Sequence, residues 1–234
     1  MTRLRSIIII ITIGALLISL VSALTSDFTW EANLDCNSGL ASSLETSRLL
    51  KVDKVIERDA SFSRARDELA KYPEFLGRKH LFFGLLTTKK TVNDTGDITM
   101  KVCDSFFGIN LLAFGKTSFQ SGMRQRDGLS TVVLARIPIV GGMLVCQDIS
   151  NHNSNIDDDL GEICFRLTHS KSNEPQRNDQ IELESRVIDY KPAISGLPTV
   201  NILRRTLYMN TQRYVHAYVM KRFHDHCYES LFDC

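Results

Sequence analysis

Two stretches of alternating side chains, followed by one long helical stretch, restrict the fold of this sequence more than any other feature. In 161–167, Ile163 and Phe165 point to the same face of an extended chain, and 180–190 alternates in the same way. From Thr199 onward the apolar residues recur at helical spacing instead. A sheet with one apolar face needs a cover, and a helix with an apolar stripe needs a surface that buries it. The sequence therefore predicts that the final helix packs on the sheet.

The segments before this C-terminal third predict helices at the start of the chain and then several short strands. The apolar pattern of 44–56 is ragged but closer to a helix than to a strand, and 61–72 has a clear helical face. Short strands follow one another between 79 and 146. Because sequential strands favour antiparallel pairing, we expect an α+β fold in which an antiparallel, curved sheet of about six or seven strands is covered by a long C-terminal helix.

The length of 234 residues suits one domain with additional terminal segments. We expect a signal peptide or uncleaved anchor over 1–23 and an N-terminal extension with a helix over 24–60. A single α+β domain over 61–226 and a C-terminal tail over 227–234 complete this division.

The first segment predicts the compartment. Arg3 and Arg5 precede an apolar run over 7–21, and small residues at 21–23 offer a cleavage site, which is typical of a signal peptide. The run to Leu24 is nearly long enough to span a bilayer, so an uncleaved anchor is the alternative. We therefore expect a secreted or lumenal protein of the secretory pathway, or a single-pass membrane-anchored protein with a lumenal domain.

Six cysteines follow the first segment, and an even number in an oxidising compartment favours disulfides. Spacing alone does not select a pairing. The candidates that would fix loose ends of the chain are Cys36, Cys227 and Cys234. The alternative is that the cysteines within predicted strands are buried free thiols.

One glycosylation sequon, beginning at Asn93, lies in a polar turn. We expect Asn93 to be a glycosylation site if the chain enters a eukaryotic secretory pathway.

The charge balance argues against a nucleic-acid partner. The chain has 28 Lys and Arg against 27 Asp and Glu, a net charge of +1. Removal of a leader that contains Arg3 and Arg5 would make the net charge slightly negative. We expect no nucleic-acid partner, and membrane contact only through an uncleaved first segment.

No motif in the sequence predicts catalysis, a metal or a cofactor. Histidines and Cys227 gather near the C-terminus, but their spacing is not that of a zinc finger. The polar loop 151–162 has calcium-ligand offsets, yet Ile156 stands where such a loop needs Gly. Nucleophile-elbow, phosphate-loop and zinc-protease motifs are absent from the sequence. We therefore predict no catalytic residue, no metal and no cofactor, and an enzyme of unknown reaction stays an alternative.

The order of several short motifs resembles a START-like, helix-grip family of unknown function that occurs in plants and bacteria. The resemblance spans about residues 61–223 and depends on segments 62–69, 161–165, 190–192, 204–205 and 212–214. Where that family has Gly-His before the Gly-Glu strand, this chain has Cys146 and Gln147, so chemistry that uses the His is not expected. The resemblance implies a curved sheet that grips the final helix.

A helix-grip fold can enclose an apolar pocket, so we expect a possible hydrophobic or lipid-like small molecule as partner. Candidate pocket residues are Phe165, Leu183, Leu207, Tyr214 and Tyr218. The alternative is a structural or interaction protein whose core is filled. A cavity of about 300 Å³ or more between the sheet and the final helix would favour binding, whereas close packing there would favour the alternative.

Overall fold

The structure, a computed structural model, describes only part of the chain. The described residues are 28–35, 38–49, 58–78, 81, 84–92, 96–120, 130–145, 161–170, 180–193 and 213–232. The predicted leader and the candidate residues Cys36, Asn93, Leu207 and Cys234 lie outside these ranges. Within the ranges, every helix is too short or too polar to cross a membrane.

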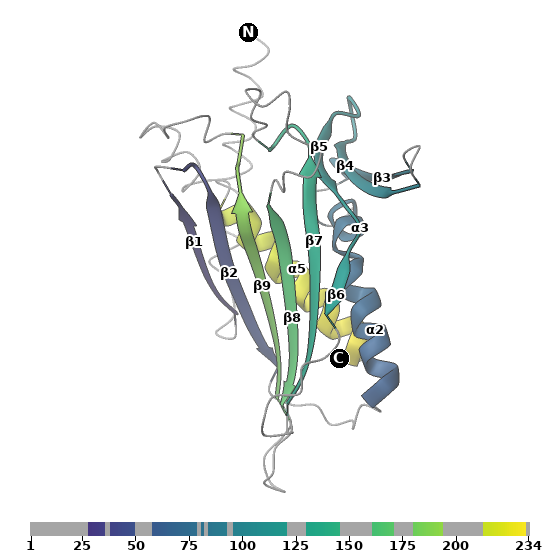
Figure 1. Cartoon of the computed structure of the whole chain (residues 1–234), viewed down its shortest axis with the longest axis vertical. Coiled ribbons are helices and arrows are strands. Elements are labelled where there is room, and N and C mark those ends of the chain that lie inside the picture. The colour runs from purple at the N-terminus through teal and green to yellow at the C-terminus, as the bar shows by residue number, and fades with distance from the viewer. Residues whose placement is uncertain are drawn as a thin grey trace, which may run out of the picture.

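Nine strands form one antiparallel sheet in the described part of the chain (Figure 1). Across the sheet the order is β1-β2-β9-β8-β7-β5-β4-β3, and β6 pairs with β7. The strands are β1 (Phe28–Leu34), β2 (Ala41–Leu49), β3 (Leu86–Val92), β4 (Ile98–Asp104), β5 (Asn110–Phe114), β6 (Ser118–Gln120), β7 (Ser130–Gly141), β8 (Glu162–Ser170) and β9 (Gln180–Tyr190). The α+β class with a curved antiparallel sheet is confirmed, with more strands than expected.

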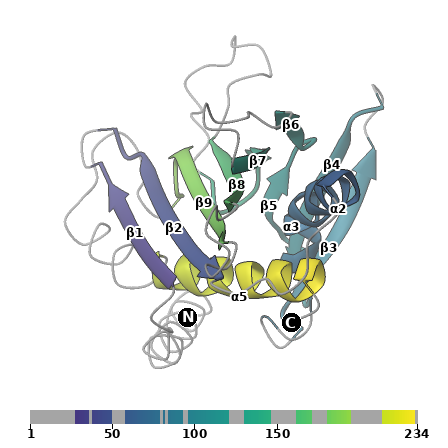
Figure 2. The ribbon, with the colours of Figure 1, turned by 90° about the horizontal axis from the view of Figure 1, so that it is seen from below.

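One long helix, α5 (Arg213–Phe232), covers the inner face of this sheet. The helices α2 (Arg58–Ala70) and α3 (Tyr72–Leu76) lie beside its C-terminal half. Figure 2 shows α5 running beneath the strands from β1 and β2 at one side to α2 at the other. The predicted packing of the final helix on the sheet is therefore confirmed, and the architecture is that of a helix grip.

Aromatic side chains fill the centre of the space between the sheet and α5. The ring of Phe223 on α5 lies 5.0 Å from the ring of Phe165 on β8 and 5.0 Å from the ring of Tyr72 on α3. Phe75 adds a fourth ring, 5.2 Å from Phe223. Such rings bury large apolar areas and favour edge-to-face contacts, so they join sheet and helices into one core.

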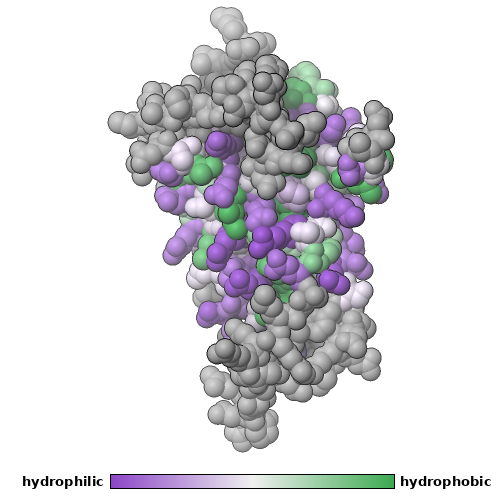
Figure 3. Space-filling model, in the orientation of Figure 1, coloured by the Kyte–Doolittle hydropathy of each residue, from purple (hydrophilic) through white to green (hydrophobic). Residues whose placement is uncertain are grey.

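The outer face of the sheet is polar and carries ion pairs within β9 and between β9 and its neighbours. Glu184 on β9 pairs with Arg166 at 3.9 Å and with Arg186 at 3.2 Å, and Arg48 pairs with Glu182 at 2.7 Å. Figure 3 shows hydrophilic residues over much of this face. Exposed pairs of this kind contribute at most about 1 kcal/mol each. The apolar side of the sheet, which is the side that a hydrophobic ligand could use, is therefore the inner one.

The prediction of a helix over 44–56 is wrong for the residues that the structure describes, since β2 extends to Leu49. The reason lies in which side chains point inward. Ser43, Glu45 and Ser47 are buried under α5, while Leu44 is only partly buried. A strand with a polar inner face does not show the apolar alternation that reveals strands.

Two predicted domain boundaries also differ from the structure. Part of the expected extension 24–60 forms β1 and β2, which are full members of the sheet. The expected tail 227–234 begins inside α5, where Cys227 and Tyr228 are buried in the core. The domain therefore includes residues on both sides of the predicted range 61–226.

Cys227 carries a free thiol, so the prediction that it forms a disulfide is wrong. Its side chain is fully buried among the apolar residues of the core. Cys103 and Cys164 are also free and buried. These three cysteines pack as small hydrophobic residues, which was the alternative interpretation for the cysteines of strands.

Candidate functional site

A cavity of about 310 Å³ lies between the inner face of the sheet and the first turns of α5. Seven strands or their ends, α3 and α5 contribute to its wall. The lining residues are Ala41, Ser42, Ser43, Tyr72, Leu76, Leu85, Leu86, Val102, Leu111, Leu112, Ile139, Leu144, Ile163, Val187, Tyr190, Val215, His216 and Val219. Nearly all of these side chains are apolar, so the wall favours an apolar occupant.

The size of the side chains along α5 explains why the space is open at this end. Val215, Val219 and Phe223 follow one another at intervals of four residues, so they lie on one face of the helix. Phe223 fills the space under the middle of α5, whereas the two valines line the cavity. On β8, Ile163 lines the cavity and Phe165 fills the core in the same manner. Val215 and Val219 on α5 and Ile163 on β8 are smaller than the phenylalanines that follow them, so space for the cavity remains between the two layers.

Apolar side chains also lie at the rim of the cavity. Leu144 is 37% exposed and lines the cavity at the same time. The turn between β4 and β5 exposes Phe106 and Phe107, at 75% and 85%. Asp104 holds this turn by accepting hydrogen bonds from their backbone N–H groups at 3.0 and 2.6 Å. Leu111, which follows this turn on β5, belongs to the wall of the cavity.

The residues that were predicted to line a pocket lie elsewhere. Phe165 and Leu183 are completely buried in the core. Tyr214 packs edge to face against an aromatic side chain of β1, and Tyr218 packs against the core. These four are not among the lining residues of the cavity, and Leu207 lies outside the described residues. The cavity is therefore closer to the start of α5 and to the β3–β5 end of the sheet than the sequence indicated.

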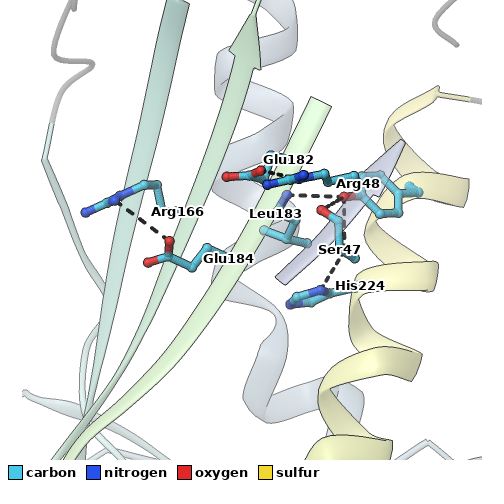
Figure 4. A network of polar contacts seen from close by, with 8 residues as sticks. Ser47, Arg48, Arg166, Glu182, Leu183, Glu184 and His224 are labelled. Carbon is cyan, nitrogen blue, oxygen red and sulfur yellow. Dashed lines mark hydrogen bonds and ion pairs between the residues drawn. The ribbon is translucent and has the colours of Figure 1, made fainter. Parts of the chain in front are cut away.

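A strip of polar side chains, buried except for the partly exposed His216, runs along the underside of α5 and reaches the cavity. Its members come from β2, β9 and α5, and they are Ser43, Glu45, Ser47, Ser185, His216, His224 and Tyr228. Figure 4 shows Ser47 of β2 and His224 of α5 pointing toward one another beside Leu183. Buried polar groups need partners, and hydrogen bonds between neighbouring members supply them along this strip.

Tyr228 on α5 lies at the end of the strip away from the cavity. The backbone N–H of Leu183 donates to the Tyr228 hydroxyl at 3.2 Å, and that hydroxyl donates to the backbone oxygen of Ser47 at 2.9 Å. The Ser47 hydroxyl lies 2.7 Å from Nδ1 of His224.

His224 is neutral, and this fixes the direction of the next hydrogen bonds. Burial, and secondarily the charge of Lys221, lowers the pKa of His224 to about 3, so the ring carries one proton. Ser185 donates its hydroxyl proton to Oε2 of Glu45 at 3.1 Å, and its oxygen lies 3.1 Å from Nε2 of His224. Ser185 therefore accepts from Nε2–H, and Nδ1 accepts from Ser47. The ring of His224 and the hydroxyl of Ser185 therefore both donate in the direction of Glu45.

Glu45 and His216 form the end of the strip that meets the cavity. Glu45 is fully buried, and its Oε1 lies 3.2 Å from Nε2 of His216, which is also 3.0 Å from the hydroxyl oxygen of Ser43. The 3.2 Å contact does not have hydrogen-bond geometry, so Oε1 has no hydrogen-bond partner in the described residues.

Tyr72 on α3 also lines the cavity. Burial raises the pKa of Tyr72, and the charges of Glu45 and Tyr190 raise it further. Tyr72 is therefore a neutral phenol at physiological pH.

The other reactive side chains of the described residues are possible metal ligands and buried cysteine thiols. No three or more His, Cys, Asp and Glu side chains of that part of the chain are placed to hold a metal ion. Burial raises the pKa of Cys164 to about 12 and raises the pKa of Cys227 as well, so neither forms the thiolate that a nucleophile requires.

The sequence analysis missed the polar strip, although a signal for part of it is present. His216, His224 and Tyr228 are separated by eight and four residues, which places them on one face of a helix. Glu45 and Ser43 gave no such signal, because 44–56 was interpreted as a helix.

Comparison with known proteins adds a likeness of overall shape. No family model matches the sequence, and no curated protein matches it. A STAR-related lipid transfer protein fragment from Xanthomonas axonopodis is 9% identical, with a TM-score of 0.39 over 87% of this chain and 95% of the fragment. A norcoclaurine synthase mutant from Thalictrum is 10% identical, with a TM-score of 0.29 over 86% of this chain and 99% of the synthase. We assign the helix-grip architecture from the strand order and α5, and take no function from these matches.

Proposed function

We propose that this chain binds a small hydrophobic molecule in the cavity under the first turns of α5. The observation that carries the proposal is the cavity itself. Its volume of about 310 Å³ lies within the range of roughly 300–1,000 Å³ that is usual for small-molecule sites. Its wall is mostly apolar, and the lining residues with polar groups are Ser42, Ser43, Tyr72, Tyr190 and His216. Binding to such a wall is favoured by roughly 25 cal/mol for each Å² of apolar surface that is removed from water.

The rim supports the same proposal. Leu144, which is 37% exposed, lines the cavity and gives it an apolar rim, and Phe106 and Phe107 expose further apolar surface in the turn between β4 and β5. A structural protein with a filled core, the alternative, would gain nothing from this open apolar space.

A substitution that fills the cavity tests the proposal. Val219→Phe adds a ring where Val219 lines the cavity, and we expect it to abolish or weaken ligand binding at least tenfold. Val92→Phe is the matched control, because Val92 is 60% exposed on β3 and a larger side chain there projects into water. Native mass spectrometry of gently purified protein should show a bound small molecule in the wild type and in Val92→Phe, but not in Val219→Phe. Equal ligand content in all three proteins, or ligand in none, would refute the proposal.

We further propose that binding takes place in the secretory pathway or outside the cell. The basic and apolar character of residues 1–23 supports this, and so does the sequon at Asn93. Expression of the full sequence in a eukaryotic cell should give a protein that loses mass on treatment with an N-glycosidase. Its N-terminus should begin after Ala23 if the leader is cleaved, and an intact N-terminus in the membrane fraction would show an anchor instead. A protein found in the cytosol, unglycosylated and uncleaved, would refute this part.

The helix-grip architecture also supports the interpretation that the chain is a distant relative of the START-like family that its sequence resembles. An experimental structure with a different strand order would refute this kinship.

A further inference from the structure

Aromatic rings close the inner end of the cavity, and they bear on the size of the ligand that it accepts. Three elements each carry an aliphatic side chain at the cavity wall and then a phenylalanine that follows on the same face of the helix or strand. The pairs are Val219 and Phe223 on α5, Ile163 and Phe165 on β8, and Leu112 and Phe114 on β5. All three phenylalanines are completely buried behind the wall.

Tyr72 on α3 joins these three rings to the cavity. Tyr72 lines the cavity, and the centre of its ring lies 5.0 Å from that of Phe223, 5.2 Å from that of Phe165 and 6.1 Å from that of Phe114. Side chains from four elements thus form one layer, which we call the aromatic floor: Tyr72, Phe114, Phe165 and Phe223. Because protein interiors are close-packed, such a layer resists displacement by a ligand. The floor therefore gives the cavity a fixed depth.

The volume and the rim limit what fits above this floor. The cavity of about 310 Å³ has room for about ten groups of the size of a water molecule or a methylene, at roughly 30 Å³ each. Leu144, which lines the cavity and is 37% exposed, marks where the cavity meets the solvent. A longer ligand leaves its excess length in water at this rim, where further methylenes contribute little to binding.

We infer that the cavity takes one slender apolar chain of about ten carbon atoms, and that Phe223 and the rest of the aromatic floor determine this length. The inference rests on the proposed function and names the class of ligand. A sterol nucleus or the two chains of a phospholipid exceed the space above the floor, so a single-chain compound such as a fatty alcohol fits best. The apolar end of the chain is the end that meets the floor, because the four rings lie there.

Straight-chain alcohols from 1-hexanol to 1-dodecanol measure the depth of the cavity by isothermal titration calorimetry. The protein is placed in the syringe, so that the long alcohols stay dissolved at low concentration. Each methylene that is buried above the floor should tighten binding about fourfold. In the wild type we expect this gain to stop at about ten carbons, after which each further carbon should change the Kd less than about twofold.

Two substitutions should move this end point in opposite directions. Val219→Leu adds a methylene above the floor, so the gain should stop about one carbon earlier. Phe223→Leu removes a ring from the floor, so the gain should continue to 1-dodecanol. Phe28→Leu is the matched control, because it removes an equal ring that is buried on β1 and packs against His224, away from the cavity wall. It should keep the wild-type end point.

Thermal melts establish that each variant is folded, and Val219→Leu decides alone if Phe223→Leu does not fold. A fourfold gain that continues through 1-dodecanol in the wild type would overturn the inference while leaving the proposed function intact. An end point that is the same in the wild type and in Val219→Leu would do so as well. Failure of every alcohol to bind a folded wild type would overturn the proposed function and the inference together.

Discussion

Acid should destabilise this fold through His224, because the folded protein keeps that ring neutral. The ring is fully buried, and both of its nitrogens have partners. Burial lowers its pKa from 6.5 to about 3. Below pH 6.5 the unfolded chain takes up a proton on His224, whereas the folded chain does so only near pH 3. The stability that depends on the neutral ring is therefore complete above pH 6.5 and is lost as the pH falls toward 3.

The size of this effect follows from how far the pH lies below the pKa that His224 has in the unfolded chain. Each pH unit below the unfolded pKa costs about 1.4 kcal/mol. Between pH 7.5 and pH 5, His224 alone should therefore lower the free energy of unfolding by about 2 kcal/mol. For a domain of this size that corresponds to a fall in melting temperature of roughly 4–8 °C.

Thermal melts by circular dichroism at a series of pH values, for the wild type and for His224→Gln, measure this contribution. Gln retains a donor and an acceptor for Ser47 and Ser185 but does not titrate. All other titrating groups are common to both proteins, so the difference between their pH profiles isolates His224. We expect the variant to be less stable at pH 7.5 and to lose less stability on acidification. Parallel profiles for the two proteins between pH 7.5 and 5 would refute the assignment of a neutral buried ring.

Three further changes test the core, a turn and a thiol. Phe223→Ala should cost about 3–5 kcal/mol in a denaturant titration, because it removes the ring that joins sheet and helices, and a loss below 1 kcal/mol would contradict this packing. Gly142→Ala should lower the melting temperature, since Gly142 has a φ of +117° and a Cβ there would collide with the carbonyl oxygen of Leu111; an unchanged melt would exclude that backbone. Cys227 should not react with a thiol reagent until denaturant is added, because it is completely buried, and rapid labelling of the native protein at Cys227 would contradict its place in the core.

The strands and the helix that could be predicted from the sequence are those whose inner side chains are apolar. On β8, Ile163, Phe165 and Leu167 point inward and are buried, as their alternation predicted. On β9, Ile181 and Leu183 do the same. When one face of a sheet is buried and the other meets water, apolar and polar residues alternate along each strand. The alternation in the sequence therefore identifies these strands and their buried face.

β2 could not be predicted from an apolar alternation, because its inner face is polar. Its inner face carries Ser43, Glu45 and Ser47, and these residues are stable there only because β9 and α5 supply hydrogen-bond partners. Those partners are more than a hundred residues away in the sequence, so no local sequence pattern indicates them. The element that sequence reasoning misplaced is thus the one that builds the polar side of the cavity, as is expected where function departs from simple burial.

α5 shows how one helix divides a fold into a packed part and an open part. One row of side chains at intervals of four, Val215, Val219 and Phe223, changes from small to large, and the cavity ends where Phe223 begins. The adjacent row contains His216, which contacts Glu45 on β2, and His224, which contacts Ser47 on β2 and Ser185 on β9. The two rows run side by side, so the apolar opening and the ring of His216 lie at the same end of the helix. A ligand that filled the proposed site would therefore meet the apolar wall and the ring of His216 on neighbouring faces of one helix.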